Sequence, residues 1–574
     1  MRRQTWKRRG RLWVALLAWS GVAGAQSWLP APTPTAAQGG AFKPGSTALQ
    51  LTDGTIMVQE YASSTWWKLT PDEHANYNTG TWSKLASSVA YNAAGAIVPY
   101  APRFFASAVL KDGSVIVEGG EYTYNVDGTP QGRTRTNMGA IFDPTKGPIG
   151  ADGTPIGAWT PVRAPLVPTP ADPFAVWPNI GDAPSIVLDD GTFMLGNIFS
   201  KTSAVLDEAT LKWKIVDATG KSDRNSEEGW TLLPGGKVLT IDTGNPIAGL
   251  PNNSEIFNPG ATPATTAVNG TWTTAHSTVR ALSYLACAPT QLHEIGPAVL
   301  RPDGTVFATG VNTCGGAGHT AIYDTKTGSW AAGKDIPCDV DGGTKVCNDM
   351  ADAPAAVLLN GNVLVQTSPG SSTGNSTFYE FELATDKFSA EIPPPTTGPG
   401  FTQTNSEPGR MLVVSSGHVF YLRSGEPGGM WFYVPQGTYE PAWTPFLTNV
   451  TDNRICVGCI NRGQTYVVSG TQLNGLSGGA AYGDDAQSAS NYPLVLIENC
   501  HSHKKYFART HDFSTMGVAT GLFNVVTAQF TVAPNTELGP SSVIVIANGI
   551  PSQPFFAGCT TGGFFTVGPV LTGN

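Results

Sequence analysis

One short pattern recurs seven times along the chain: an apolar strand, a turn that ends in glycine, and a second apolar strand. Most of these turns carry Asp-Gly or Asn-Gly, as expected of a tight two-residue hairpin whose central residues need positive φ. The turn glycines are Gly54, Gly113, Gly191, Gly236, Gly304, Gly361 and Gly417. Repetition at this scale indicates stacked units, none of which buries its apolar faces alone.

Each hairpin is followed by a third strand and then by a fourth strand with a central aromatic residue. Those aromatic residues are Trp82, Trp159, Trp213, Trp272, Trp330, Phe388 and Trp443. Four antiparallel strands per unit predict an all-β fold with a seven-bladed β-propeller, in which the aromatics pack between neighbouring blades. Trp28 resembles one more fourth strand, so either Trp28 or Trp443 completes the last blade.

The repeat defines the expected domains. We expect a propeller over residues 41–447, preceded over 26–40 by a linker or a ring-closing strand. From about residue 448 the hairpin repeat stops, and alternating strands such as Asn491-Tyr-Pro-Leu-Val-Leu-Ile and Ser541-Ser-Val-Ile-Val-Ile take over. These predict an immunoglobulin-like β-sandwich over 448–574.

The first 25 residues have the layout of a secretory signal peptide. Six basic residues lie between Arg2 and Arg11, an apolar run follows, and Ala23-Gly24-Ala25 offers a small-residue cleavage site. The paired arginines also permit a twin-arginine signal. We therefore expect a secreted or periplasmic protein with no membrane span, because the apolar run is too short to cross a bilayer.

Charge limits the class of partner. Removing the signal leaves 28 basic and 43 acidic side chains, a net charge of −15 against −9 for the whole chain. An acidic surface of this size argues against nucleic acid or anionic membrane as a partner.

Eight cysteines remain in the expected mature chain, and an even number in an exported protein favours disulfides. Proximity pairs Cys338 with Cys347, Cys287 with Cys314, Cys500 with Cys559 and Cys456 with Cys459. The Cys456-Val-Gly-Cys459 segment is also compatible with a redox or metal motif.

Acidic residues stand just before the first strand of five repeats, where they would line the mouth of the propeller channel. They occur in the segments beginning at Asp182, Glu227-Glu228, His293-Glu294, Asp352 and Glu407, and Arg103 has the comparable place in the second repeat. Converging carboxylates repel unless something compensates. The candidates are Arg103, a divalent cation such as Ca²⁺, which prefers oxygen ligands, and a cationic or polyhydroxylated ligand. The alternative is structural: the acids hydrogen-bond neighbouring blades and hold the ring together.

The repeated hairpins, the Gly-x-Trp strands and the segments Asn491-Tyr-Pro-Leu and Arg509-Thr-His511-Asp together resemble the galactose oxidase and glyoxal oxidase superfamily. From about residue 41 onward, the resemblance implies a kelch-type propeller with a C-terminal immunoglobulin-like domain. It also implies an axial copper held by two tyrosines and two histidines, one tyrosine being cross-linked to a cysteine. Phe105 stands where a tyrosine is expected, and only His511 matches a ligand. We therefore do not expect copper, since one imidazole cannot bind it in a defined geometry.

Two functions fit these residues. The first is a protein that binds a carbohydrate or another protein at the acidic axial face, with calcium as a candidate cofactor. The second is an enzyme: an oxidase of the resembled type with altered ligands, or a glycan-active enzyme that uses carboxylates. Fold does not transfer chemistry by itself, so the site residues decide between them.

Overall fold

The computed structural model describes residues 26–35, 44–167, 175–243, 251–260, 270–283, 294–312, 316–341, 343–370, 374–402, 404–451, 458–481, 491–555 and 565–570. The expected signal peptide, residues 1–25, lies outside this part of the chain. Within it the fold is all-β, and the one helical element is the 3₁₀ turn Pro441–Trp443. No helix among the described residues is long and apolar enough to cross a membrane.

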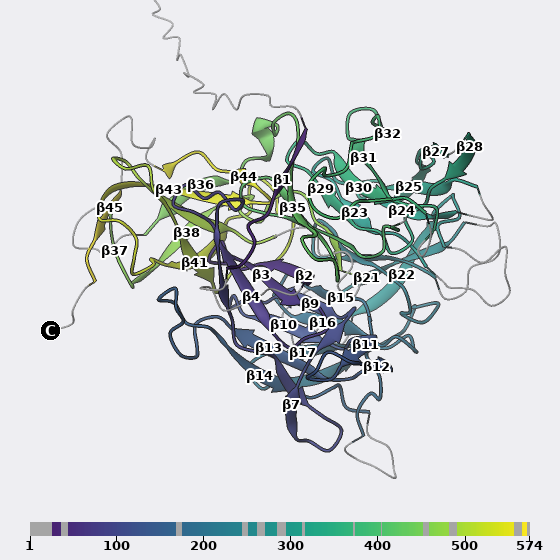
Figure 1. Ribbon diagram of the computed structural model, residues 1–574, viewed down its shortest axis with the longest axis horizontal. Helices are drawn as coiled ribbons and strands as arrows, with labels where there is room; N and C mark the ends of the chain where they lie inside the picture. Colours follow the sequence, from purple (N-terminus) through teal and green to yellow (C-terminus); the bar gives the residue numbers. More distant parts are fainter. Residues whose placement is uncertain are drawn as a thin grey trace, which may run out of the picture.

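Seven groups of four antiparallel strands follow one another along the sequence, here called repeats 1 to 7 (Figure 1). Repeats 1 to 3 are β2 (Gly45–Gln50), β3 (Ile56–Glu60), β4 (Trp66–Thr70), β5 (Thr81–Lys84); β9 (Ala106–Val109), β10 (Val115–Glu118), β13 (Gly139–Asp143), β14 (Ala158–Val162); and β15 (Ser185–Val187), β16 (Phe193–Gly196), β17 (Ser203–Asp207), β18 (Lys212–Val216). Repeats 4 and 5 are β19 (Trp230–Leu232), β20 (Val238–Ile241), β21 (Asn253–Asn258), β22 (Thr271–Ser277); and β23 (Ala298–Leu300), β24 (Thr305–Asn312), β25 (Gly318–Asp324), β26 (Ser329–Ala332). Repeats 6 and 7 are β29 (Ala355–Val357), β30 (Val363–Thr367), β31 (Thr377–Glu382), β32 (Lys387–Phe388); and β33 (Gly409–Val413), β34 (Val419–Arg423), β35 (Met430–Val434) with β1 (Ser27–Pro30).

The first strands of successive repeats lie side by side around a common centre. Contacts run in order from β9 through β15, β19, β23, β29 and β33 to β2. This arrangement is propeller-like: each sheet covers the apolar face of the next, so the buried clusters join strands of neighbouring repeats.

The amino-terminal strand completes the last repeat. Strand β1 pairs antiparallel with β35, with Trp28 opposite Tyr433 (Figure 1). Trp28 packs its ring against Phe378, Tyr421 and Tyr433. Trp443, the other candidate for this place, lies in the 3₁₀ turn that leads out of repeat 7.

The hairpin turns differ in one respect from the two-residue turns expected from the sequence. Only the glycine is left-handed: φ is 79° at Gly54 and 83° at Gly361, whereas the Asp or Asn before it keeps negative φ. In repeat 1 the Gly54 amide donates to the Leu51 carbonyl, which makes a type I turn followed by a left-handed glycine. The side chain before the glycine stabilises the turn, as where Asp53 accepts a hydrogen bond from the Thr55 amide at 3.0 Å.

The fourth-strand tryptophans join neighbouring repeats, as predicted. The indole N–H of Trp159 in repeat 2 donates to the Ala86 carbonyl, just after repeat 1, at 2.8 Å. The Trp213 indole likewise donates to the Arg163 carbonyl at 2.7 Å, and the Trp28 indole donates to the Pro393 carbonyl at 3.0 Å. The hydrogen bond satisfies the polar end of a ring whose remaining surface packs against apolar side chains.

The remaining residues add small hairpins and a large C-terminal sheet. The hairpins are built from β6 (Val89–Tyr91), β7 (Ile97–Pro99), β8 (Pro102–Arg103), β11 (Tyr122–Tyr124), β12 (Pro130–Arg133), β27 (Cys338–Asp341) and β28 (Thr344–Cys347). The C-terminal sheet contains β36 (Phe446–Val450), β37 (Cys459–Asn461), β38 (Thr465–Thr471), β40 (Leu494–Asn499), β41 (Lys505–His511), β42 (Val526–Thr531), β43 (Gly539–Ala547), β44 (Ile550–Pro551) and β45 (Phe565–Gly568). Strand β41 pairs first with β40 and then with β42, so it bends between two layers.

The C-terminal strands pack on the hairpin turns of the repeats. The Thr510 amide donates to the Thr52 carbonyl, and the Met516 amide donates to the Asp189 carbonyl at 2.8 Å. A short strand of this region, β39 (Ala480–Ala481), leaves the C-terminal sheet and pairs with the free edge of β19. The C-terminal part of the chain therefore reaches the centre of the repeats.

The disulfide predictions are borne out where the structure describes both cysteines. Cys338 and Cys347 face each other across the β27–β28 hairpin and are bonded. Cys459 and Cys500 are also in disulfides. Cys287, Cys314, Cys456 and Cys559 lie outside the described residues.

We expect replacement of Trp28 to weaken the closing pair between β1 and β35. Trp28→Ala removes the hydrogen bond to Pro393 and three aromatic contacts, and should lower the free energy of unfolding by about 2 kcal/mol. Urea unfolding at pH 7 measures it. Trp28→Phe keeps the ring contacts and should lose about half as much. Equal stability of Trp28→Ala and the parent chain would contradict a closing role.

Candidate functional site

The acidic residues singled out in the sequence converge at one end of the first strands. They lie in the loops that enter these strands, at the end opposite the hairpin turns on which the C-terminal sheet packs. We define the axial cluster as Arg103, Asp182, Glu227, Glu294, Asp352 and Glu407. Its members come from six successive repeats, so they come together only because the first strands surround one centre.

Three carboxylates form the middle of the axial cluster. One oxygen from each of Glu227, Glu294 and Asp352 lies within 4.8 Å of the others, and all three side chains are partly exposed. This spacing allows three oxygen ligands to share one cation. These acidic groups could therefore hold a metal ion.

Arg103 lies at one side of this group and partly compensates its charge. Its Nη2 is 3.3 Å from Oε1 of Glu407. The guanidinium also stacks over Phe104, 4.1 Å from the ring centroid, and over Tyr61 at 5.5 Å. The Tyr124 hydroxyl donates to that of Tyr61 at 3.3 Å, so two phenols flank the arginine. No pattern in the sequence points to these tyrosines.

Asp182 is the most enclosed of the axial acids, with 7% of its surface exposed. Its Oδ1 is buried and makes no hydrogen bond within the described residues. Burial, together with Glu227 and other nearby carboxylates, raises the pKa of Asp182 well above its ordinary value. A cation or a hydrogen-bond donor placed beside Asp182 would therefore stabilise the site.

Asp352 and Glu294 form a carboxyl pair. Burial raises the pKa of Asp352 well above its ordinary value, and charge repulsion by Glu294 and the hydrogen bond to it raise the pKa further. The sequence pattern could not predict this contact, since it depends on the distance between repeats 5 and 6.

Glu228 does not belong to the axial cluster, contrary to expectation. It is completely buried and points away from the centre, where Lys221 Nζ lies 2.8 Å from its Oε1. Asp223, Asp242 and Glu255 surround the same ammonium group, with Lys221 Nζ 2.6 Å from Asp223 and 3.1 Å from Glu255. Glu227, the residue before Glu228, supplies the axial carboxylate of this repeat instead. Glu227 lies in a turn with positive φ, so its side chain and that of Glu228 leave the backbone in different directions.

The backbone of the entry loops is held in an unfavourable conformation at several axial positions. Glu227 has φ of 59°, Asp352 has 51° and Phe104 has 53°. Left-handed non-glycine residues of this kind cost on the order of 1 kcal/mol each and persist where the surroundings hold them. At Glu227 the holding contacts are the Lys221–Glu228 ion pair and the hydrogen bond from Thr243 Oγ1 to the Ser226 carbonyl.

The histidines contribute nothing to this site among the described residues. His293 lies outside them. His511 is in β41 of the C-terminal sheet, where its Nδ1 is 2.8 Å from Asp512 and its Nε2 3.0 Å from Thr531. The described residues contain two groups of three clustered ligand side chains, and both are entirely acidic.

The copper site implied by the superfamily resemblance does not fit the residues present. Phe105, at the position of an expected tyrosine, is fully buried in the core and has no ligand atom. Carboxylate oxygens favour hard cations such as Ca²⁺ or Mg²⁺ over copper. The described residues therefore do not form the copper site that the resemblance implies.

Comparisons with known proteins add little that is specific. No protein-family model and no curated protein matches the sequence. Among solved structures, the chain is similar to a fungal alcohol oxidase of the AA5 family in complex with copper, with 13% identity, a TM-score of 0.47, and coverage of 95% of this chain and 100% of that one. It is also similar to virginiamycin B lyase from Staphylococcus aureus, with 10% identity, a TM-score of 0.36, and coverage of 71% and 98%. A third is an ulvan lyase of family PL25, with 11% identity, a TM-score of 0.37, and coverage of 69% and 96%.

Replacing the buried lysine should destabilise repeat 4. Lys221→Met leaves Asp223, Glu228, Asp242 and Glu255 without their shared counter-charge, and should lower the free energy of unfolding by about 3–5 kcal/mol at pH 7. Urea unfolding measures the loss. The exposed Lys237 in the same repeat is the matched control, and Lys237→Met should change stability by less than about 0.5 kcal/mol. A Lys221→Met protein as stable as the parent would refute the role of the ion pairs.

The raised pKa of Asp182 predicts a pH dependence of stability. Because the folded state holds this proton more tightly than the unfolded state, the protein should lose stability as pH rises above about 4, by up to about 1.4 kcal/mol per unit, until the folded-state pKa is passed. Asp182→Asn cannot ionise and should reduce this slope. Unfolding free energies from pH 4 to 8 test it, with the exposed Glu440→Gln as a control that keeps the parent slope. An unchanged slope in Asp182→Asn would contradict the assignment.

Proposed function

We propose that this chain is an exported carbohydrate-binding protein whose axial cluster holds a divalent cation, calcium being the best fit, and binds sugar hydroxyls around it. The observation that supports this most is the group formed by Glu227, Glu294 and Asp352, whose oxygens lie within 4.8 Å of one another beside a buried, unsatisfied oxygen of Asp182. The axial cluster sets five carboxyl groups against one cationic member, Arg103, with Arg410 nearby over the Phe104 ring at 5.4 Å, so a bound cation would lower the mutual repulsion of the acids.

The proposed architecture follows the repeats. Repeats 1 to 7 would be the seven blades of one propeller over residues 41–447, with β1 from residues 26–40 as the closing strand. Residues 448–574 would form the immunoglobulin-like sandwich, and residues 1–25 a cleaved signal peptide. The Cys338–Cys347 disulfide fits an extracellular or periplasmic location, because such bonds persist in oxidising compartments.

Calcium suits the donors better than other common ions. Three carboxylates from separate loops offer hard oxygen ligands in an irregular geometry, which Ca²⁺ tolerates and Mg²⁺ does not. A bound cation would also offset the mutual repulsion of the axial acids. Open coordination positions on such an ion can be filled by hydroxyl groups of a ligand.

A carbohydrate suits the surroundings of the cation. Arg103 and the hydroxyls of Tyr61 and Tyr124 provide hydrogen-bond donors and acceptors, and the partly exposed tyrosine rings provide apolar surface for the face of a sugar. A protein ligand at the same acidic face remains an outcome of the test below.

One observation favours a second candidate, a glycan-active enzyme. Burial and the neighbouring Glu294 raise the pKa of Asp352 well above its ordinary value, as the general acid of glycoside cleavage requires. The same residues would then act on the glycan that the first proposal has them bind.

The experiment is calcium and glycan binding by the full-length secreted protein. Calorimetric titration of the metal-free protein with CaCl₂ should give one site with a dissociation constant on the order of 10⁻⁴ M, as in extracellular calcium modules. A glycan array should show binding that EDTA abolishes. The combined variant Glu227→Gln, Glu294→Gln and Asp352→Asn should weaken calcium binding at least tenfold, while Glu440→Gln should not.

The outcomes separate the candidates. Absence of calcium binding, or binding that the triple variant leaves unchanged, would overturn the cation site. Selection of proteins but no glycans by the calcium-bound chain would replace the carbohydrate with a protein ligand. Release of reducing ends from a bound glycan, lost in Asp352→Asn, would establish the enzyme.

A further inference from the structure

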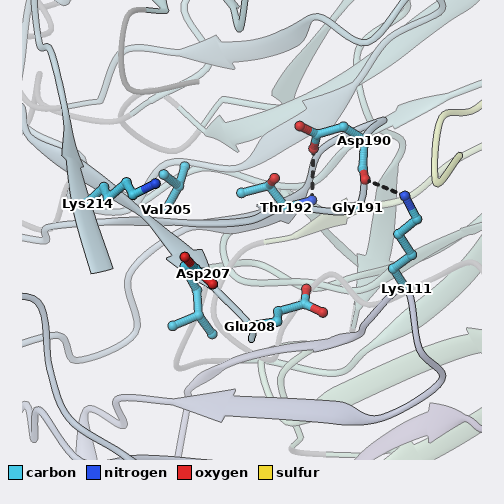
Figure 2. Close-up of a pocket in the computed structure, with 9 residues that line it drawn as sticks. Lys111, Asp190, Gly191, Thr192, Val205, Asp207, Glu208 and Lys214 are labelled. Atoms are coloured by element: carbon cyan, nitrogen blue, oxygen red, sulfur yellow. Dashed lines mark hydrogen bonds between the residues drawn. The ribbon is translucent and has the colours of Figure 1, made fainter. Parts of the chain in front are cut away.

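A second cavity lies away from the axial cluster, on the outer part of repeats 2 and 3. It encloses about 280 Å³ and is lined by Lys111, Asp190, Gly191, Thr192, Val205, Leu206, Asp207, Glu208 and Lys214 (Figure 2). Lys111 comes from the turn of repeat 2, residues 190–192 from the turn of repeat 3, and the rest from β17, β18 and the turn between them. Nothing in the proposed axial function uses this cavity.

The floor of the cavity is apolar and its shape is fixed. Val205 and Leu206 are each 2% exposed and belong to the buried cores. One wall is the stem of Lys111, whose Nζ donates to the Asp190 carbonyl at 3.0 Å. A side chain at Gly191 would meet Lys111 Cδ at 2.5 Å, so glycine is required for the stem to pass.

Polar groups with unused hydrogen-bonding capacity surround this floor. Thr192 is 5% exposed, and its Oγ1 is buried without a hydrogen-bond partner within the described residues. Figure 2 shows the carboxylates of Asp207 and Glu208 at one side of the cavity and the ammonium of Lys214 at its end. Among the described residues, neither Glu208 nor Lys214 belongs to an ion pair. A buried hydroxyl without a hydrogen bond destabilises the protein, so a ligand that bonds to it is favoured.

These features exclude a simple ion and favour a larger neutral ligand. The cavity's carboxylates are not among the acidic groups whose oxygens converge within 4.8 Å. Donors from the two lysines and acceptors from the carboxylates are instead spread around an apolar floor. A volume just below the range of about 300–1,000 Å³ typical of small-molecule pockets limits the ligand to a single small ring.

We propose that this cavity is a second binding site and takes a neutral, polyhydroxylated molecule the size of one sugar ring. The ring lies with its apolar face on Val205, and its hydroxyls bond to Thr192 Oγ1, the Asp207 and Glu208 carboxyl groups and Lys214 Nζ. The site is independent of the axial cluster, and each can exist without the other.

Glu208 gives the binding a characteristic pH dependence. Burial and the neighbouring Asp112, Asp190 and Asp207 raise the pKa of Glu208 to about 7, and Lys111 opposes the shift. A bound neutral ligand removes water from this carboxyl and so favours its protonated form. Affinity should therefore be higher at pH 6 than at pH 8.

The test is binding of methyl glycosides of glucose, galactose and mannose to the full-length protein, by saturation-transfer NMR and titration calorimetry. At least one should bind with a dissociation constant of about 1–10 mM, which corresponds to roughly −4 to −3 kcal/mol. Thr192→Val should weaken it at least fivefold, and Glu208→Gln should remove the difference between pH 6 and 8. The matched control is Thr536→Val, another buried hydroxyl without a partner within the described residues, which does not line the cavity and should bind as the parent does.

Chelation of the axial cation with EDTA distinguishes this site from the axial one, because it should leave methyl glycoside binding at the cavity unchanged. The proposal is overturned if none of the three glycosides binds at roughly 100 mM, ten times the weakest expected dissociation constant. It is equally overturned if binding survives Thr192→Val and Glu208→Gln but is lost in EDTA, which would assign the sugar to the axial cluster.

Discussion

The pairing of β1 with β35 is the constraint on which the rest of the structure depends. Each repeat has two apolar faces and can bury them only against neighbours, so an open row of seven sheets would leave its two end faces in water. Residues 27–30 pair with residues 431–434, at opposite ends of the repeated region. The contact between β33 and β2 brings the first and last repeats together. Loop closure over this length is entropically unfavourable, and the aromatic contacts of Trp28 with Phe378 and Tyr433 help to offset it.

Closure also creates the axial cluster. Asp182, Glu294, Asp352 and Glu407 are each separated by 50 or more residues along the chain, yet they face one centre because each precedes the first strand of its repeat. Bringing them together costs electrostatic energy, which the structure lowers in two ways. Arg103 pairs with Glu407, and the raised pKa of Asp352 favours its neutral form. The repulsion that remains is the physical basis for expecting a cation.

A second charged group, formed by Lys221 and the acids around it, stabilises the conformation of the axial cluster. Lys221 is fully buried among Asp223, Glu228, Asp242 and Glu255, where its charge is matched by several carboxylates. By fixing Glu228, it keeps the neighbouring Glu227 in a left-handed conformation that points to the centre. The ion pairs of Lys221 thus help to position the axial cluster, although none of these four acids belongs to it.

The repeating strands could be predicted from the sequence alone, because the period-two apolar pattern and the turn glycines are local properties. The sequence also determined which loops carry the axial acids, the Cys338–Cys347 hairpin disulfide and the inter-repeat packing of the tryptophans. The tertiary structure was needed to show that Trp28 completes repeat 7. It also shows that Glu227 faces the centre where Glu228 was expected, and that Tyr61 and Tyr124 flank Arg103. It alone revealed the cavity between Lys111 and Glu208. These depend on distances between residues remote in sequence and on which side of the backbone a residue points, and a one-residue change in register reverses that side.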